Sequence, residues 1–170
     1  MDLKQVVRSV QDFPVKGVLF RDIVPVLQDA EALECAIDSM EGILGPFAFD
    51  KIAAPESRGF IFGMPLAYKL KRGFIPIRKA GKLPCETIRR SYSLEYGSAV
   101  LEMDRYAVRP GERVIIADDL LATGGTCKAI AEMLADAGAA VAAMAFFIEL
   151  EDLRGRELLR DYNVVSVLKY

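Results

Sequence analysis

The chain has 170 residues, a formal net charge of -2 at pH 7, and 52% hydrophobic and 27% charged residues. This length and composition predict one globular domain over residues 1–170, large enough to bury a core without disulfides or a structural metal. The slightly acidic balance argues against a dedicated nucleic-acid binder, because phosphate backbones require a basic surface.

The chain has three cysteines, Cys35, Cys85 and Cys127, and no histidine. Their spacing is not that of metal ligands, so a zinc site is excluded, as are Ser-His-Asp and Cys-His mechanisms. No secretory signal is visible at the N-terminus, and the longest apolar run, 139–148, is shorter than the roughly 20 residues that span a bilayer. We therefore predict a cytoplasmic protein with reduced thiols and no membrane partner.

Helical and strand patterns alternate along the chain. Apolar residues at helical spacing predict a helix over 31–44, with Asp29 as its cap and Gly45-Pro46 as its stop. The further expected elements are a strand at 51–54, a helix at 59–71, strands at 74–77 and 113–117, a helix at 125–137, a strand at 141–148, a short helix at 153–160 and a strand at 164–168. This order predicts an α/β fold with a mostly parallel sheet, in which ligands bind at the carboxyl ends of the strands.

Residues 78–97 (RKAGKLPCETIRRSYSLEYG) interrupt this alternation. The segment has no clear period, and it carries five cations: Arg78, Lys79, Lys82, Arg89 and Arg90. Long loops without regular structure are uncommon inside compact domains and usually serve as functional lids or are disordered. We therefore expect this segment to take part in function.

The strongest local signal is VIIADDLLATGGT, residues 114–126. An apolar strand ends in two acids, Asp118 and Asp119, and is followed by Ala122, Thr123, Gly124, Gly125 and Thr126 and then by a helix. Glycines allow the backbone to turn tightly and to present its N–H groups to an anion, and the N-terminus of the following helix adds unpaired amides. The segment predicts a binding site for a phosphate monoester.

Two carboxylates beside a phosphate site require an explanation, because like charges repel. Vicinal hydroxyls are good donors to carboxylates, so a sugar phosphate would place its ribose against Asp118 and Asp119. The two acids are also suited to an outer-shell Mg²⁺. The Walker pattern and G-x-G-x-x-G, which mark other phosphate sites, do not occur in the chain.

The segment 114–126 resembles the motif with which type I phosphoribosyltransferases bind 5-phosphoribosyl-1-pyrophosphate (PRPP). Four further segments resemble the members of that family that act on adenine, in the family's order and at its approximate spacing: FPVKGVLFRDI (13–23), ESRGFIFG (56–63), IRKAGKLP (77–84) and SYSLEYG (91–97). The resemblance covers nearly the whole chain. It implies a five-stranded parallel core sheet flanked by helices, a small N-terminal hood (1–30), a flexible catalytic loop (78–97) and a homodimer.

The same resemblance implies a role for particular residues. Leu19, Phe20 and Arg21 bind adenine, with Phe20 stacked on the purine, and Glu95 is the catalytic group that handles the purine proton. The pyrophosphate of PRPP is bound by Glu56, Ser57, Arg58, Lys79, Lys82 and Tyr96, and Mg²⁺ is held mainly by PRPP rather than by direct protein ligands. A cis peptide is expected between Glu56 and Ser57, where Pro55 precedes in place of the small residue usual in many relatives.

Two alternatives remain open at this point. A phosphoribosyltransferase for hypoxanthine, guanine or xanthine would have much the same PRPP site, with base choice set by the hood and by residues near 149–154. A non-catalytic regulator that senses PRPP would keep the fold, but such proteins usually carry an additional DNA-binding domain. The expected reaction is transfer of the 5-phosphoribosyl group from PRPP to N9 of adenine, giving AMP and pyrophosphate.

Overall fold

The computed structural model describes residues 1–93 and 98–170. The chain divides into two compact units, Met1–Ser39 and Met40–Tyr170. Helix α3 (Ala30–Leu44) begins in the first unit and ends in the second. No helix in the described residues is long and apolar enough to cross a membrane.

The first unit contains a two-stranded antiparallel hairpin that the sequence periods did not indicate. Its elements are α1 (Leu3–Val6), β1 (Arg8–Gln11), β2 (Leu19–Asp22), α2 (Val24–Gln28) and the start of α3. The rings of Phe13 and Phe20 meet edge to face, with their centroids 5.1 Å apart. The carboxylate of Asp29 accepts the N–H of Ala32 at 2.8 Å, which confirms the predicted helix cap.

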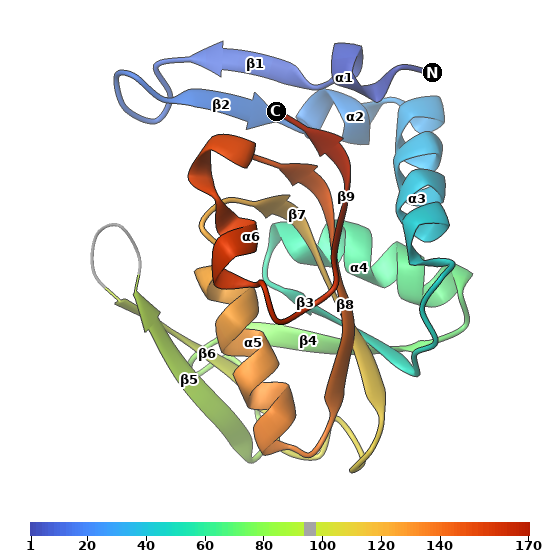
Figure 1. Ribbon diagram of the computed structural model, residues 1–170, viewed down its shortest axis with the longest axis vertical. Coiled ribbons are helices and arrows are strands. Elements are labelled where there is room, and N and C mark those ends of the chain that lie inside the picture. Colours follow the sequence, from blue (N-terminus) through green and yellow to red (C-terminus); the bar gives the residue numbers. More distant parts are fainter. Residues whose placement is uncertain (94–97) are drawn as a thin grey trace. The chain divides into compact units, whose positions relative to one another are not determined.

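The second unit is built on a seven-stranded sheet in the order β5-β6-β4-β3-β7-β8-β9 (Figure 1). Strands β4, β3, β7, β8 and β9 are parallel, and β6 and β5 extend one edge as an antiparallel pair. The strands are β3 (Lys51–Pro55), β4 (Gly73–Lys79), β5 (Thr87–Ser93), β6 (Ser98–Asp104), β7 (Arg113–Leu121), β8 (Ala140–Glu149) and β9 (Val164–Lys169). The predicted α/β fold with five parallel core strands is confirmed.

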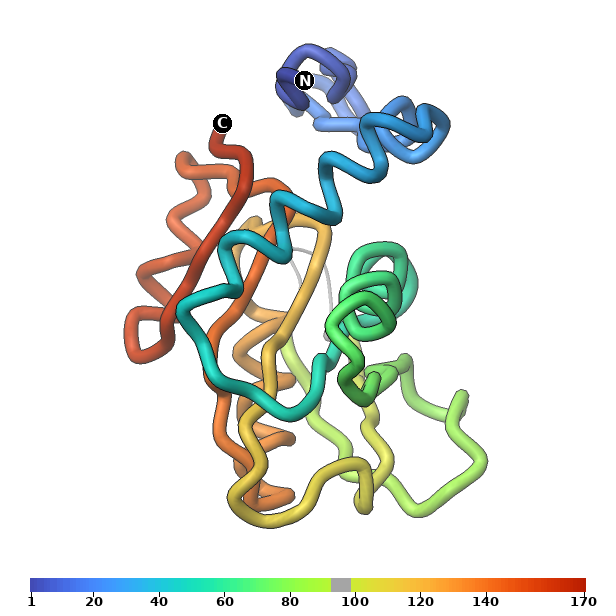
Figure 2. The backbone as a smooth tube through the Cα atoms, turned by 90° about the vertical axis from the view of Figure 1, so that its right-hand side faces the viewer, coloured from blue at the N-terminus to red at the C-terminus, as the bar shows by residue number. Residues whose placement is uncertain are grey.

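Helices α4 (Arg58–Lys69) and α5 (Gly125–Asp136) cover opposite faces of this sheet (Figure 2). Successive side chains of a strand point to opposite faces. Phe147 of β8 accordingly stacks on Phe62 of α4, with ring centroids 4.9 Å apart, whereas its neighbour Phe146 belongs to the core under α5. Both faces of the central strands are therefore buried, as the apolar runs of the sequence require.

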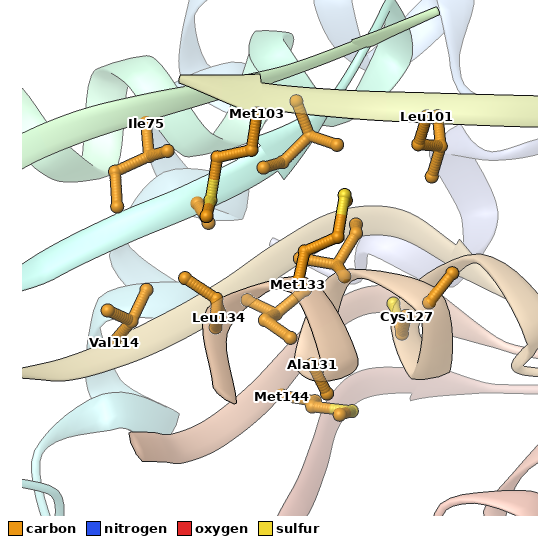
Figure 3. Close-up of a cluster of buried hydrophobic side chains, with 14 of the residues drawn as sticks. Ile75, Leu101, Met103, Val114, Cys127, Ala131, Met133, Leu134 and Met144 are labelled. Atoms are coloured by element: carbon orange, nitrogen blue, oxygen red, sulfur yellow. The ribbon is translucent and has the colours of Figure 1, made fainter. Parts of the chain in front are cut away.

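The core under α5 joins this helix to strands from both halves of the sheet. Met133 and Leu134 of α5 are fully buried among Ile75, Met103 and Val114 (Figure 3). Burial of such side chains contributes about 1.5–3 kcal/mol each relative to exposure. This packing holds the first turn of α5 at the carboxyl ends of the strands.

Three predicted elements differ from the structure. Strand β7 continues past 117 to Leu121, because β8 offers ladder partners as far as Glu149. The segment 78–97 is not without regular structure, since β5 occupies Thr87–Ser93 as an edge strand. The short helix at 153–160 is divided into a 3₁₀ turn (Glu151–Leu153) and α6 (Gly155–Leu158), because Arg154 between them is left-handed, with φ of 52°.

Candidate active site

A cleft of about 300 Å³ opens at the carboxyl ends of β3, β4 and β7. Seven residues singled out from the sequence line it: Glu56, Ser57, Arg58, Lys79, Asp118, Asp119 and Thr126. Pro55, Gly59, Tyr92 and Leu101 complete the lining. Residues far apart in the chain therefore meet where the topology of a parallel sheet places ligands.

The two acids of β7 lie side by side and are held differently. Asp119 is buried, and its Oδ2 lies 2.9 Å from Nε of Arg58. Asp118 accepts the backbone N–H of Asp119 at 2.8 Å. Burial raises the pKa of Asp118 well above its usual range, and the charge of Asp119 raises it further. Burial also raises the pKa of Asp119, although the guanidinium of Arg58 opposes this effect.

The N-terminus of α5 supplies the donors for an anion. Its N-cap is Gly124, which has φ of 87° and makes no side-chain capping bond to the first turn. The amides of this turn are thus available to a ligand, and the helix dipole favours negative charge there. Cys127, in the first turn of the helix, is buried, and its pKa is raised well above the usual thiol value by burial and by the charge of Asp118.

The N-terminus of α4 forms a second site of the same kind. Its N-cap, Ser57, makes no side-chain capping bond, and the peptide that joins it to Glu56 is cis, as expected. A Cβ on Gly59 would lie 2.7 Å from Cδ of Pro55 and 2.9 Å from Oδ1 of Asp118. The absence of a side chain at Gly59 therefore lets the first turn of α4 approach both Pro55 and the acid of β7.

Glu56 connects this second site to the end of β4. Its Oε1 accepts the N–H of Lys79 at 2.6 Å and lies 3.5 Å from Nε of Arg78. Burial alone raises the pKa of Glu56, but the bond from Lys79 and the charge of Arg78 outweigh it and leave the pKa below the usual value. The ionised carboxylate thus fixes the backbone that carries Lys79.

The turn after β4 is held by a buried acid that sequence reasoning missed. Glu102 of β6 is fully buried, and its Oε1 accepts the N–H groups of Lys82 at 2.7 Å and Leu83 at 2.8 Å. Its Oε2 lies 3.2 Å from Nε of Arg89. Burial raises the pKa of Glu102, but the backbone donors and Arg89 prevail and lower it overall. The sequence does contain a signal for this residue, since Glu102 stands between the apolar Leu101 and Met103 of β6.

We expect Glu102→Ala to lower the free energy of unfolding by about 1–3 kcal/mol, because it leaves the partly buried N–H groups of Lys82 and Leu83 and the exposed Arg89 without their acceptor. Glu102→Gln keeps one acceptor oxygen and should cost about 1 kcal/mol. A carboxylate with a lowered pKa stabilises the fold above the ordinary 4.5, and this contribution is lost as the pH falls through the lowered value. The free energies of unfolding in urea of wild type and Glu102→Gln should therefore become more similar as the pH falls into the acid range. An equal difference at all pH values would contradict this assignment.

Some predicted site residues lie elsewhere. Ala122, Thr123 and Gly124 form the turn between β7 and α5, and Gly125 lines a neighbouring pocket beside α5. Lys82 lies in the turn held by Glu102, outside the cleft lining. Leu19, Phe20 and Arg21 form part of β2 in the first unit. Glu95 and Tyr96 fall outside the described residues. Tyr92 was missed as a lining residue, although it lies in the recognised SYSLEYG segment.

Comparison with known proteins identifies the family of this chain. The model of the phosphoribosyl transferase domain matches residues 30–170, and the chain belongs to this family. It is 51% identical over 168 residues to adenine phosphoribosyltransferase of Lachnoclostridium phytofermentans, covering 99% of this chain and 97% of that protein. The resemblance found in the sequence is confirmed.

Two solved structures extend the similarity. Adenine phosphoribosyltransferase of Thermoanaerobacter pseudethanolicus has a TM-score of 0.96 at 48% identity, with coverage of 99% of this chain and 98% of that one. The Saccharomyces cerevisiae adenine phosphoribosyltransferase, solved with an iminoaltritol bisphosphate and adenine, has a TM-score of 0.92 at 37% identity, with coverage of 98% and 97%. The fold thus extends across almost the full length of both proteins.

Proposed function

We propose that this chain transfers the 5-phosphoribosyl group of PRPP to N9 of adenine, releasing AMP and pyrophosphate. The observation that carries the proposal is the convergence of two helix N-termini on one cleft, with a pair of acids between them. PRPP has a phosphate at one end, a pyrophosphate at the other and a diol between, which this arrangement matches. The names of the relatives support adenine as the base.

The ribose 5-phosphate end is assigned to β7 and α5. The phosphate binds the turn and first helical residues, Ala122, Thr123, Gly124, Gly125 and Thr126, through backbone amides and the threonine hydroxyls. The ribose hydroxyls donate to Asp118 and Asp119. Arg58 supports this role, because its contact with Asp119 favours the ionised acceptor despite burial.

The pyrophosphate end is assigned to the segments after β3 and β4. Ser57 and Arg58 begin α4, Glu56 fixes Lys79, and Lys82 lies in the adjoining turn. Tyr96 is assigned here by family resemblance alone. Positive charge at these positions stabilises the leaving group as the bond to C1 of the ribose breaks.

Mg²⁺ is proposed as the metal that accompanies PRPP. Carboxylate oxygens such as those of Asp118 and Asp119 are the hard donors that suit it, here as outer-shell partners. When bound, the ion offsets the charge of the departing pyrophosphate.

The base site is assigned to Leu19, Phe20 and Arg21 of β2, with Phe20 as the stacking platform. Glu95 handles the purine proton.

Residues 1–170 act as one phosphoribosyltransferase domain, in which 1–30 form the hood and 78–97 the catalytic loop. Closure of that loop excludes water, which would otherwise hydrolyse PRPP.

A homodimer in the cytoplasm completes the proposal. Met64 and Tyr68, one turn apart on α4, are 50% and 86% exposed and offer apolar surface for a second copy. Cys35, Cys85 and Cys127 are all free thiols, which suits a reducing compartment. Light scattering of the purified chain measures the oligomeric state.

The direct test incubates the chain with PRPP, Mg²⁺ and each purine in turn, with nucleotide and pyrophosphate measured. We expect AMP from adenine, with kcat/KM about a hundredfold or more above that for hypoxanthine, guanine or xanthine. Preference for a 6-oxopurine would support the alternative base specificity. Binding of PRPP without any turnover would support the regulator.

A further inference from the structure

Helix α6 touches the turn between β7 and α5 at a point where no side chain fits. Gly155, the first residue of α6, is buried. A Cβ at this position would lie 2.4 Å from the carbonyl oxygen of Ala122 and 2.8 Å from Cδ1 of Leu121. The carbonyl oxygen belongs to the backbone, so it cannot move away without displacing the turn itself.

The turn between β7 and α5 likewise has no room for a side chain where it faces α6. Gly124 has a positive φ of 87°, and a Cβ there would lie 3.0 Å from the carbonyl oxygen of Gly155 and 3.2 Å from Cγ of Leu159. Leu159 is fully buried and lies against Gly124. The backbone of the turn at Gly124 and the backbone of α6 at Gly155 are thus in direct contact, with no side chain between them.

The neighbouring residue fixes α6 to the sheet. Arg156 donates from Nε and Nη2 to the carboxylate of Glu149, at 2.5 and 2.8 Å, and from Nη1 to the carbonyl oxygen of Val164 at 2.7 Å. Ser166 of β9 donates to the same carboxylate. Glu149 is buried at the end of β8, and bidentate arginine–carboxylate pairs hold a defined geometry. The surface of α6 that meets the turn is therefore held by β8 and β9.

We propose that Gly155 is a positioning residue for the phosphate-binding turn. The contact with the Gly155 backbone sets the position of residues 122–124 relative to α6. It thereby sets the direction of the amides at the start of α5. This role rests on the proposed binding of the ribose 5-phosphate by residues 122–126. Gly155 acts through the turn and does not itself contact substrate.

The test compares Gly155→Ala with Gly42→Ala, a matched substitution in α3 where a Cβ meets nothing within 4 Å. Displacing the turn weakens phosphate binding in ground and transition states alike, so KM for PRPP should rise about tenfold while kcat stays within about threefold. KM for adenine should stay within about twofold of wild type. Gly42→Ala should match wild type in all three constants.

Binding of ribose 5-phosphate, used as a probe, tests separately whether the turn binds phosphate and whether Gly155 positions the turn. It should raise Tm of wild type and Gly42→Ala, and raise Tm of Gly155→Ala much less at the same concentration. No rise in wild type would overturn the proposed role of the turn. A normal rise and a normal KM for PRPP in Gly155→Ala would overturn the positioning role alone, even with a lower starting Tm. If Gly155→Ala does not fold, Leu159→Val provides the second variant: an increased KM for PRPP supports the role, and an unchanged one overturns it.

Discussion

Replacing Asp118 and Asp119 together by asparagine is expected to lower kcat/KM for PRPP by about a hundredfold or more. Each acid is assigned as an ionised acceptor for a ribose hydroxyl, and a hydrogen bond to a charged group contributes about 1.5–3 kcal/mol. Steady-state kinetics with varied PRPP at saturating adenine measures the effect. Glu34→Gln with Asp161→Asn, at exposed positions, removes the same charge and should keep wild-type kinetics.

Although replacement of the two acids should lower activity, the single substitution Asp118→Asn should raise the stability of the folded protein. Burial and the neighbouring charge raise its pKa, so its ionised form costs free energy in the folded protein at neutral pH. Asp118→Asn removes this cost, and a gain of about 1 kcal/mol would raise Tm by roughly 2–4 °C in a chain of this size. The gain should shrink as the pH falls through the raised pKa, because wild type then binds the proton itself. A large loss of Tm together with activity would indicate that the pair is structural.

Replacing Glu95 by alanine is expected to lower kcat by about 10²–10⁴-fold, the usual contribution of a positioned acid or base. KM for PRPP should change little, because Glu95 is assigned to the purine proton and not to PRPP. Glu86→Ala is the matched control in the same segment: Glu86 is exposed and pairs with Arg105 at 2.7 Å. Scanning calorimetry should find Tm unchanged in both variants. Wild-type kcat in Glu95→Ala would remove this residue from the mechanism.

The central strands were predictable because their physics is local. Runs such as RVIIA are rich in β-branched residues, and both sheet faces are covered, so apolar character persists along the strand. The end of β7 was not predictable in this way. Asp118 and Asp119 interrupt the apolar run, but β8 continues to pair with the strand to Leu121, which only the tertiary fold determines.

The edge strand β5 was missed for a related reason. Its sequence TIRRSYS alternates, and Ile88 and Tyr92 pack against the core under α5. Arginines between them gave the segment the composition of a solvated loop, whereas charged residues are common on edge strands, where they oppose aggregation. The N-terminal hairpin was missed because its two strands are short and contain no fully buried residue, so they give almost no apolar period.

For the site, the sequence predicted that Asp118, Asp119 and Thr126 act with Ser57, Arg58 and Lys79 on one substrate. The structure brings these residues together in one cleft, because all lie at or just beyond the carboxyl ends of parallel strands. Glu102, Arg156 and Gly155 could not be found in this way. Their importance comes from contacts between segments distant in the chain, and a single glycine or ion pair has no distinctive sequence pattern. The residues proposed to contact the substrate were thus more visible in the sequence than those that hold them in place.

The burial of Cys127 makes a labelling experiment practical. Cys127 is 2% exposed, whereas Cys85 lies exposed in the turn that leads into β5. A maleimide dye should therefore attach at Cys85 in preference to Cys127, and Cys35→Ser would remove the partly exposed third thiol. The fluorescence of such a conjugate would test whether the proposed catalytic loop moves during turnover, with the proposed phosphate-binding turn left chemically untouched.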